Sequence, residues 1–180
     1  PRRLFSRRCV LSILLATAVM LPNTSTAFRT PFGDRVSSAV NRGLAWMRTQ
    51  IENGQYNGVT TAIAGLVFLE RRTSRHWNAP TRGYANSTQN DKARLRQMAA
   101  AVIGNDPALT GEGEPEAYRT GTNLSFLALY RSTGGPNELG AVVTVGEAIA
   151  NGVDALVSIQ APADADPCLA SSWNYVQPLE

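Results

Sequence analysis

Residues 58–70 read GVTTAIAGLVFLE, an apolar stretch without a charge until its last position. Its aliphatic side chains, among them Val59, Ile63 and Leu66, are spread around the whole circumference of a helix and leave no polar side. Asn57 can cap such a helix, because its side-chain oxygen can accept a hydrogen bond from the first free backbone N–H groups. We expect a helix over residues 58–70 that is buried on most sides.

Four more segments have the pattern of helices. The stretch 116–131 is again apolar on all sides, and Gly134-Gly135-Pro136 ends it. The segments 35–50, 91–103 and 139–160 are amphipathic, with apolar residues three or four apart along one stripe. No stretch shows the alternation of a strand, so the sequence predicts an all-α fold.

The order of these helices indicates their arrangement, because amphipathic helices alternate with apolar ones. In a double-layered ring, the inner helices contact the outer layer on one side and a cavity or neighbours on the other, whereas the outer helices face water. A helix bundle would make all of its helices amphipathic. We therefore expect a partial α/α toroid built from helical hairpins, with a bundle as the second choice.

A repeated segment supports the ring. Residues 42–50 read RGLAWMRTQ and residues 151–160 read NGVDALVSIQ, so that Gly152 follows Gly43 by 109 residues. Two-helix repeats are roughly 40–47 residues long. The spacing therefore corresponds to two repeats plus the long loop over 73–90.

At these residues, over about 35–175, the sequence resembles the prenyltransferase and squalene-cyclase repeat family, whose members form α/α toroids. The first copy of the family's glutamine–tryptophan motif would consist of Arg42, Gly43, Trp46, Met47, Gln50, Gly54 and Tyr56. The second would consist of Gly152, Leu156 and Gln160, with Trp173 as its closing aromatic residue after an insertion. Both copies depart from the pattern: Gln50 comes one residue early, Tyr56 replaces tryptophan, and Ala155 stands where an aromatic residue belongs. In the family, these residues link neighbouring repeats, so we expect Trp46 to be largely buried.

The catalytic residues that the resemblance implies are not matched. Cyclisation of squalene requires a strongly acidic carboxyl group in a cluster of acids, but Asp164 and Asp166 stand alone between two prolines in a predicted loop. Protein prenyltransferases bind zinc through Asp, Cys and His, whereas His76 and Cys168 are too few to form such a site. We expect no catalytic residue, metal or cofactor in residues 1–180.

One loop has the composition of a binding site. His76 and Trp77 lie near Arg82 and Tyr84 in the connection between the second and third helices. Aromatic and basic residues on loops often contact ligands. This loop could cover the mouth of a toroid, and the alternative is that its aromatic residues pack against helix ends.

Residues 1–27 have the three parts of an export signal. Four arginines precede an apolar run of about a dozen residues, and Ser25-Thr26-Ala27 offers small residues for cleavage before Phe28. The run is shorter than the roughly 20 residues of a membrane span, so we expect no permanent anchor. Arg7-Arg8 resembles a twin-arginine signal, and the general secretory route stays open. The protein is expected in the periplasm or outside the cell, with 28–180 as its mature domain.

The charge excludes one class of partner. The chain carries a net charge of +3, but residues 1–27 hold four arginines and no acid, which leaves 13 basic and 14 acidic residues in the remainder. A nucleic-acid-binding surface is therefore not expected. The chain opens at Pro1 and stops after Pro178-Leu179-Glu180 without a closing element, so we expect a fragment of a longer precursor.

Two functions follow from these features. The favoured one is a non-catalytic toroid that binds an apolar ligand or a protein partner. The alternative is a cyclase- or transferase-like enzyme acting on an isoprenoid or another apolar substrate, with its catalytic acids in further repeats. Because no catalytic motif is complete in residues 1–180, the sequence leaves the question of an enzyme open.

Overall fold

The computed structural model describes residues 31–54, 58–74 and 78–160. In this part of the chain it contains helices α2 (Pro31–Glu52), α3 (Val59–Glu70), α4 (Gln89–Asn105), α5 (Pro107–Thr110), α6 (Ala117–Ser132) and α7 (Val145–Ser158). These ranges contain no strand, and an isolated antiparallel bridge joins Arg72 to Thr81. The predicted all-α class is confirmed for the described residues.

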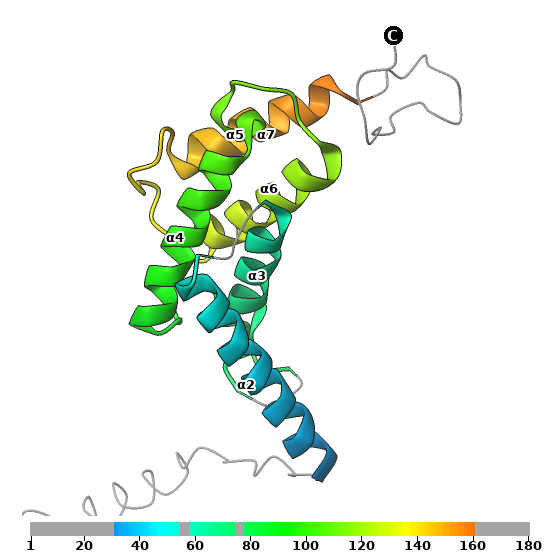
Figure 1. Ribbon diagram of the computed structural model, residues 1–180, viewed down its shortest axis with the longest axis vertical. Coiled ribbons are helices and arrows are strands. Elements are labelled where there is room, and N and C mark those ends of the chain that lie inside the picture. Colours follow the sequence, from blue (N-terminus) through cyan, green and yellow to red (C-terminus); the bar gives the residue numbers. More distant parts are fainter. Residues whose placement is uncertain (1–30, 55–57, 75–77, 161–180) are drawn as a thin grey trace, which may run out of the picture.

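The helices α3, α4, α6 and α7 form the main body of the structure (Figure 1). Helix α3 packs against α4 and α6, α6 packs against α7, and the short α5 lies against α4 and α7. Helix α2 approaches this group with its C-terminal half, where Leu44 is buried and Met47 and Ile51 are partly buried. Its N-terminal half extends away from the other helices (Figure 1).

The core lies where α3 and α6 cross. Gly65 permits this contact, because a Cβ atom at that position would lie 2.2 Å from Cε2 of Phe126. The larger fully buried side chains around the crossing come from four helices and are Leu69, Leu95, Ile103, Leu127, Tyr130 and Val145. The apolar stretches of α3 and α6 thus supply the centre of the fold.

Helices α3 and α6 are nevertheless not buried on all sides. On α3, Thr61, Gly65 and Phe68 are buried, whereas Ile63 and Val67 are exposed. On α6, Tyr118 is exposed. The face of α3 toward α4 and α6 is buried as expected. Ile63 and Val67 form an apolar strip of α3 that stays exposed.

The start of the last helix differs from the prediction. The predicted helix over 139–160 begins only at Val145, because Thr144 caps it. The Thr144 hydroxyl accepts a hydrogen bond from Glu147 N at 3.2 Å, and the Glu147 carboxylate accepts one from Thr144 N at 2.8 Å. This reciprocal pair satisfies two free backbone donors, so the helix starts there although the apolar residues before it continue the stripe.

Helix α5 was not predicted. Pro107 ends α4 as expected, but it also occupies the first turn of a new helix, where a residue without an N–H group loses nothing. Asp106 caps this helix by accepting a hydrogen bond from Ala108 N at 3.3 Å. The four-residue helix α5 therefore replaces part of the expected loop.

Several sequence predictions concern residues outside the described ranges. They are the signal segment 1–27, the aromatic residues Tyr56, Trp77 and Trp173, the loop residue His76, and the acids Asp164 and Asp166. Within the described ranges, no helix combines the length and the hydropathy that a membrane crossing requires.

Candidate functional site

A groove runs between α2 and the chain that connects α3 to α4. Its volume is about 400 Å³. One wall is the outer side of α2, and the other is residues 71–74 and Arg82. The lining residues are Val36, Ser37, Val40, Asn41, Arg71, Arg72, Thr73, Ser74 and Arg82. The groove therefore combines an aliphatic wall with hydroxyl groups and three arginines.

Backbone hydrogen bonds bring the two ends of the connection together. Arg82 N donates to Arg71 O at 2.7 Å, and Thr73 N donates to Pro80 O at 2.9 Å. The bridge between Arg72 and Thr81 lies between these bonds. This pairing places Arg71 and Arg82 next to each other, although the two residues are 11 positions apart in the sequence.

The arginines of the groove have different partners. Arg71 donates to Asn41 Oδ1 at 3.2 Å, and Arg72 donates to the carbonyl oxygen of Ala79 at 2.8 Å. The guanidinium of Arg82 makes no hydrogen bond or ion pair with the residues that the structure describes. Arg82 is therefore the cation of the groove that is most available to a ligand.

The groove also concentrates positive charge. Burial lowers the pKa of Arg71 from its usual value, and the charges of Arg82 and Arg48 lower it further, against the opposing charge of Asp91. Neighbouring cations that destabilise one another gain free energy when an anion binds between them. The site thus favours a small anion, and Val36 and Val40 favour an apolar group beside it.

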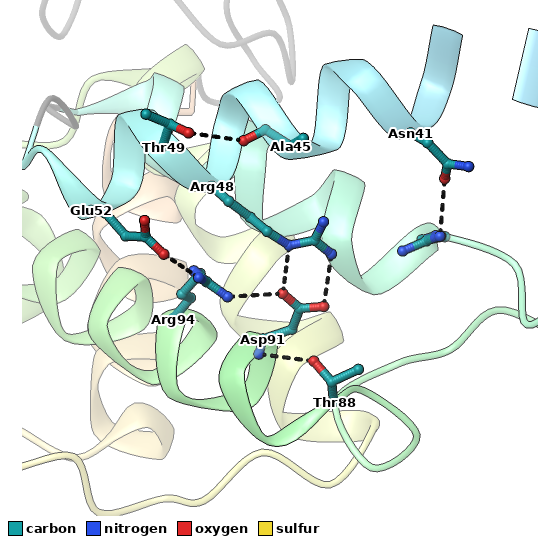
Figure 2. A network of polar contacts seen from close by, with 9 residues as sticks. Asn41, Ala45, Arg48, Thr49, Glu52, Thr88, Asp91 and Arg94 are labelled. Atoms are coloured by element: carbon teal, nitrogen blue, oxygen red, sulfur yellow. Dashed lines mark hydrogen bonds and ion pairs between the residues drawn. The ribbon is translucent and has the colours of Figure 1, made fainter. Parts of the chain in front are cut away.

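Helix α2 is held in position by a network of ion pairs that Figure 2 shows from close by. Arg48 of α2 donates two hydrogen bonds to the carboxylate of Asp91 of α4, both at 3.0 Å. Arg94 contacts Asp91 at 3.3 Å and also pairs with Glu52. The network joins the C-terminal half of α2 to α4, and the groove residues Val36, Val40 and Asn41 lie on the N-terminal half of the same helix.

A second polar cluster is buried between α5 and α6 and serves the fold. The Asp106 carboxylate accepts hydrogen bonds from Asn123 Nδ2 at 2.9 Å and from the Thr120 hydroxyl at 3.5 Å. Arg119 lies 3.9 Å from the same carboxylate. These contacts, together with the cap on α5, join the two helices.

The predicted binding loop is divided by the structure. Arg82 lines the groove, and His76 and Trp77 lie outside the described residues. Tyr84 is only 8% exposed and packs edge-on against Tyr130, with ring centroids 5.0 Å apart. Its assignment to a binding surface is therefore corrected: Tyr84 belongs to the core, as in the alternative in which loop aromatics pack on helices.

The groove contains residues that the sequence analysis missed. Arg71 and Arg72 follow the uncharged helix α3 directly, and this pair at a helix end was the signal that could have identified them. Val36 and Val40 were assigned to the buried stripe of the first helix, whereas both are about half exposed. The apolar stripe of α2 therefore extends beyond the part of the helix that packs against the other helices.

The two copies of the repeat motif have different surroundings. Gly152 is buried, but Gly43 has open space where a Cβ atom would lie. Trp46 is 64% exposed, so the prediction that it is largely buried is wrong for this structure. The other described motif residues are at the surface or half-buried: Arg42, Gln50, Gly54, Leu156 and Gln160.

The reason for the exposure of Trp46 is the position of α2. Arg42 donates to Ser38 Oγ of its own helix at 3.0 Å, and Gly54 has a φ of 68° just after the helix end. Arg42 and Trp46 lie at the surface of α2, whereas Leu44, Met47 and Arg48 face the other helices. Gly43 therefore makes no contact of the kind that Gly152 makes.

Within the described residues, no three His, Cys, Asp or Glu side chains lie close enough to hold a metal ion. Comparison of the chain with family models, with curated proteins and with solved structures finds no match. The resemblance to the prenyltransferase and squalene-cyclase repeat therefore rests on the motif residues alone. The interpretation of the groove rests on the residues that line it.

Proposed function

We propose that this chain binds an amphiphilic anion in the groove between α2 and residues 71–74 and 82, without converting it. The observation that carries the proposal is the position of Arg71 and Arg82 beside Val36 and Val40. Arginine forms paired hydrogen bonds with carboxylates and phosphates and stays protonated at neutral pH. It suits anion binding and does not suit proton transfer. The valines provide contact area for the apolar part of the same ligand.

The groove is part of a larger proposal about the protein. We propose that the helices belong to an α/α toroid of the prenyltransferase and squalene-cyclase repeat type, and that residues 1–27 direct the protein to the periplasm or the outside of the cell. The toroid is supported by the contact between the apolar helices α3 and α6, with the amphipathic α4 and α7 packed beside them. Export is supported by the three parts of the N-terminal segment.

Calorimetric titration of the full chain with octyl phosphate tests the groove. We expect binding that weakens as salt is added, because salt screens charge–charge attraction. Octanol and inorganic phosphate should each bind less tightly than octyl phosphate. Arg82→Gln should weaken octyl phosphate binding about tenfold, because a hydrogen bond to a charged group contributes about 1.5 kcal/mol.

Two variants of the same chain make this test specific. Arg96→Gln removes one exposed charge from α4 outside the groove, and it should leave the affinity within a factor of about two if bulk charge is unimportant. Val40→Ser should weaken binding of octyl phosphate but not of inorganic phosphate. Equal loss in the Arg82 and Arg96 variants would show that the attraction is nonspecific.

The enzyme remains the alternative function. It draws its support from the family resemblance, which implies cyclisation or prenyl transfer on an isoprenoid substrate. Incubation of the chain with squalene and with a prenyl diphosphate, followed by product analysis, separates the two functions. Turnover above the background of a heat-denatured sample would overturn the non-catalytic proposal, even where the groove binds octyl phosphate as expected.

A further inference from the structure

Helix α2 carries an exposed apolar surface around a glycine. We call Val36, Ala39, Val40 and Gly43 the Gly43 face, since these residues lie on one side of the helix at spacings of three and four. Val36 is 45% exposed and Val40 is 51% exposed, and a Cβ atom on Gly43 would meet nothing within 4 Å. An apolar strip of this kind on a helix is normally covered by another element.

The same pattern occurs on α7, where it is covered. The register that places Gly43 on Gly152 also places Val36 on Val145, Ala39 on Ala148 and Val40 on Ile149. On α7 these residues are buried or partly buried in the core. The two helices share these four positions, which a neighbour covers on α7 and leaves exposed on α2.

The neighbours on α7 are α5 and α6. A Cβ atom on Gly152 would lie 2.6 Å from Leu109 Cδ2 and 2.8 Å from Leu124 Cδ2, so a larger residue there would push these two leucine side chains away from the helix. Asn151 strengthens the contact by donating from Nδ2 to the carbonyl oxygen of Leu109 at 3.1 Å. At the equivalent position of α2 stands Arg42, which can make the same donation.

The opposite sides of the two helices show the converse relationship. Leu44 of α2 is buried in the core, whereas Val153, its equivalent on α7, is 47% exposed. Each helix thus has a covered side where the other has an open one. This is the pattern of two units of one repeat, in which α2 has no neighbour of the α5–α6 kind among the residues that the structure describes.

We propose that the Gly43 face binds a helical hairpin that presents two leucine side chains across Gly43, as α5 and α6 present Leu109 and Leu124 to Gly152. A second folded copy of this chain does not offer that surface in the residues the structure describes, because its own α7 covers Leu109 and Leu124. The partner is therefore a separate hairpin with the same leucine spacing. Val36 and Val40 also line the groove, so a hairpin that covers them would compete with the apolar part of an anion bound there.

The hairpin of this chain is itself the probe. A labelled peptide spanning residues 106–132 contains both α5 and α6, and its binding to the full chain is measured by fluorescence anisotropy. We expect saturable binding to the wild-type chain without any anion present. The matched peptide with Leu109→Ala and Leu124→Ala should bind at least about tenfold more weakly, because two buried leucine contacts are lost.

A variant on the receptor side locates the binding. Gly43→Leu should fold as the wild type does, since its side chain enters open space, and it should lose peptide binding at least about tenfold because the leucine fills the position of the partner's side chains. Circular dichroism and thermal unfolding check the fold. If that variant does not fold, Val40→Asp takes its place, because Val40 is half exposed.

Three results would overturn the proposal. The first is the absence of peptide binding to the wild-type chain. The second is binding that Gly43→Leu or Val40→Asp leaves unchanged, which would place the peptide elsewhere, for instance on an exposed α7. The third is a dimer in sedimentation that Gly43→Leu abolishes and that the peptide does not displace, which would assign the face to a second copy.

Discussion

Arg48 and Asp91 form two parallel hydrogen bonds, both 3.0 Å long, across the contact between α2 and α4 (Figure 2). The side chain of Asp91 is almost completely buried, and the guanidinium of Arg48 also lies 5.4 Å from the ring centroid of Phe68 on α3. One arginine thus contacts two helices at once. Leu44 is the buried residue of α2, with Met47 and Ile51 partly buried, and this pair is the buried polar attachment of α2 to α4.

Asp91→Asn should lower the free energy of unfolding by about 2 kcal/mol, because it removes charge-assisted hydrogen bonds to Arg48 and Arg94 at a buried position. Urea unfolding followed by circular dichroism measures the change. Asp154→Asn, on an exposed position of α7, is the matched control and should change stability by less than about 0.5 kcal/mol. A similar loss in both variants would contradict the role of the pair.

The pair also predicts a dependence on acid. Burial alone would raise the pKa of Asp91, but hydrogen bonds and charge from Arg48, with Thr88 and Arg94, outweigh it and hold the pKa below the ordinary value of 3.8. The unfolded chain therefore binds a proton more readily than the folded one. Stability from this group is fully present above about pH 5 and is lost as the pH falls through the lowered pKa.

The free energy of unfolding, measured at pH 6 and at pH 3, tests whether stability is lost as the pH falls. The wild-type chain should lose more stability over this interval than Asp91→Asn, which has no carboxyl group to titrate. Glu147 contributes in the same direction, since its hydrogen bonds with Thr144 lower its pKa as well. An equal loss of stability in the wild type and the variant would show that other carboxylates cause the destabilisation at low pH.

Two glycine substitutions in the apolar helices should have opposite effects. Gly65→Ala should destabilise the chain by about 1–3 kcal/mol, because its Cβ atom would collide with the ring of Phe126 at the crossing of α3 and α6. Gly121→Ala in α6 meets open space, and it should stabilise the chain by about 0.5–1 kcal/mol through the better helix propensity of alanine. Thermal unfolding of both variants gives the comparison, and a common sign would contradict it.

Trp46→Ala should change the stability of this chain by less than about 1 kcal/mol, because an exposed side chain loses little burial when it is truncated. A buried tryptophan would cost about 3–5 kcal/mol. Urea unfolding distinguishes the two values directly. A large loss would mean that Trp46 is covered in solution, as the repeat motif led us to expect.

Export should produce a chain that begins at Phe28. Mass spectrometry of the secreted or periplasmic product measures its first residue, and a cytosolic product that retains Arg7 and Arg8 would contradict the signal. Replacement of that pair by two lysines separates the routes. A twin-arginine signal should stall, whereas the general secretory route should tolerate the change.

The positions of the longer helices could be predicted because hydrophobic periodicity is a local property. The stripes over 35–50 and 91–103 and the apolar runs over 58–70 and 116–131 all became helices within a few residues of the expected bounds. The errors occurred where capping decided the boundary. Thr144 and Glu147 form a capping box inside an apolar pattern, and hydrophobic periodicity does not detect such a box.

The candidate site could be predicted only in part. Arg82 was expected in a binding loop, but Tyr84, two residues later, packs into the core against Tyr130. Composition also suggested no basic surface, because the mature chain has a balanced charge. The groove is basic because a backbone pairing brings Arg71 and Arg82 together, and a net charge carries no information on such a contact.

The sequence by itself determined the helical class and the positions of the two apolar helices α3 and α6, since both depend on neighbours along the chain. The repeat that would relate Gly43 to Gly152 stays a prediction. Only the tertiary structure decided which side of each helix is covered. Val36 and Val145 occupy the same register, yet one is half exposed and the other is fully buried. The physical reason is that burial depends on which element packs against a helix face, and that element is distant in sequence.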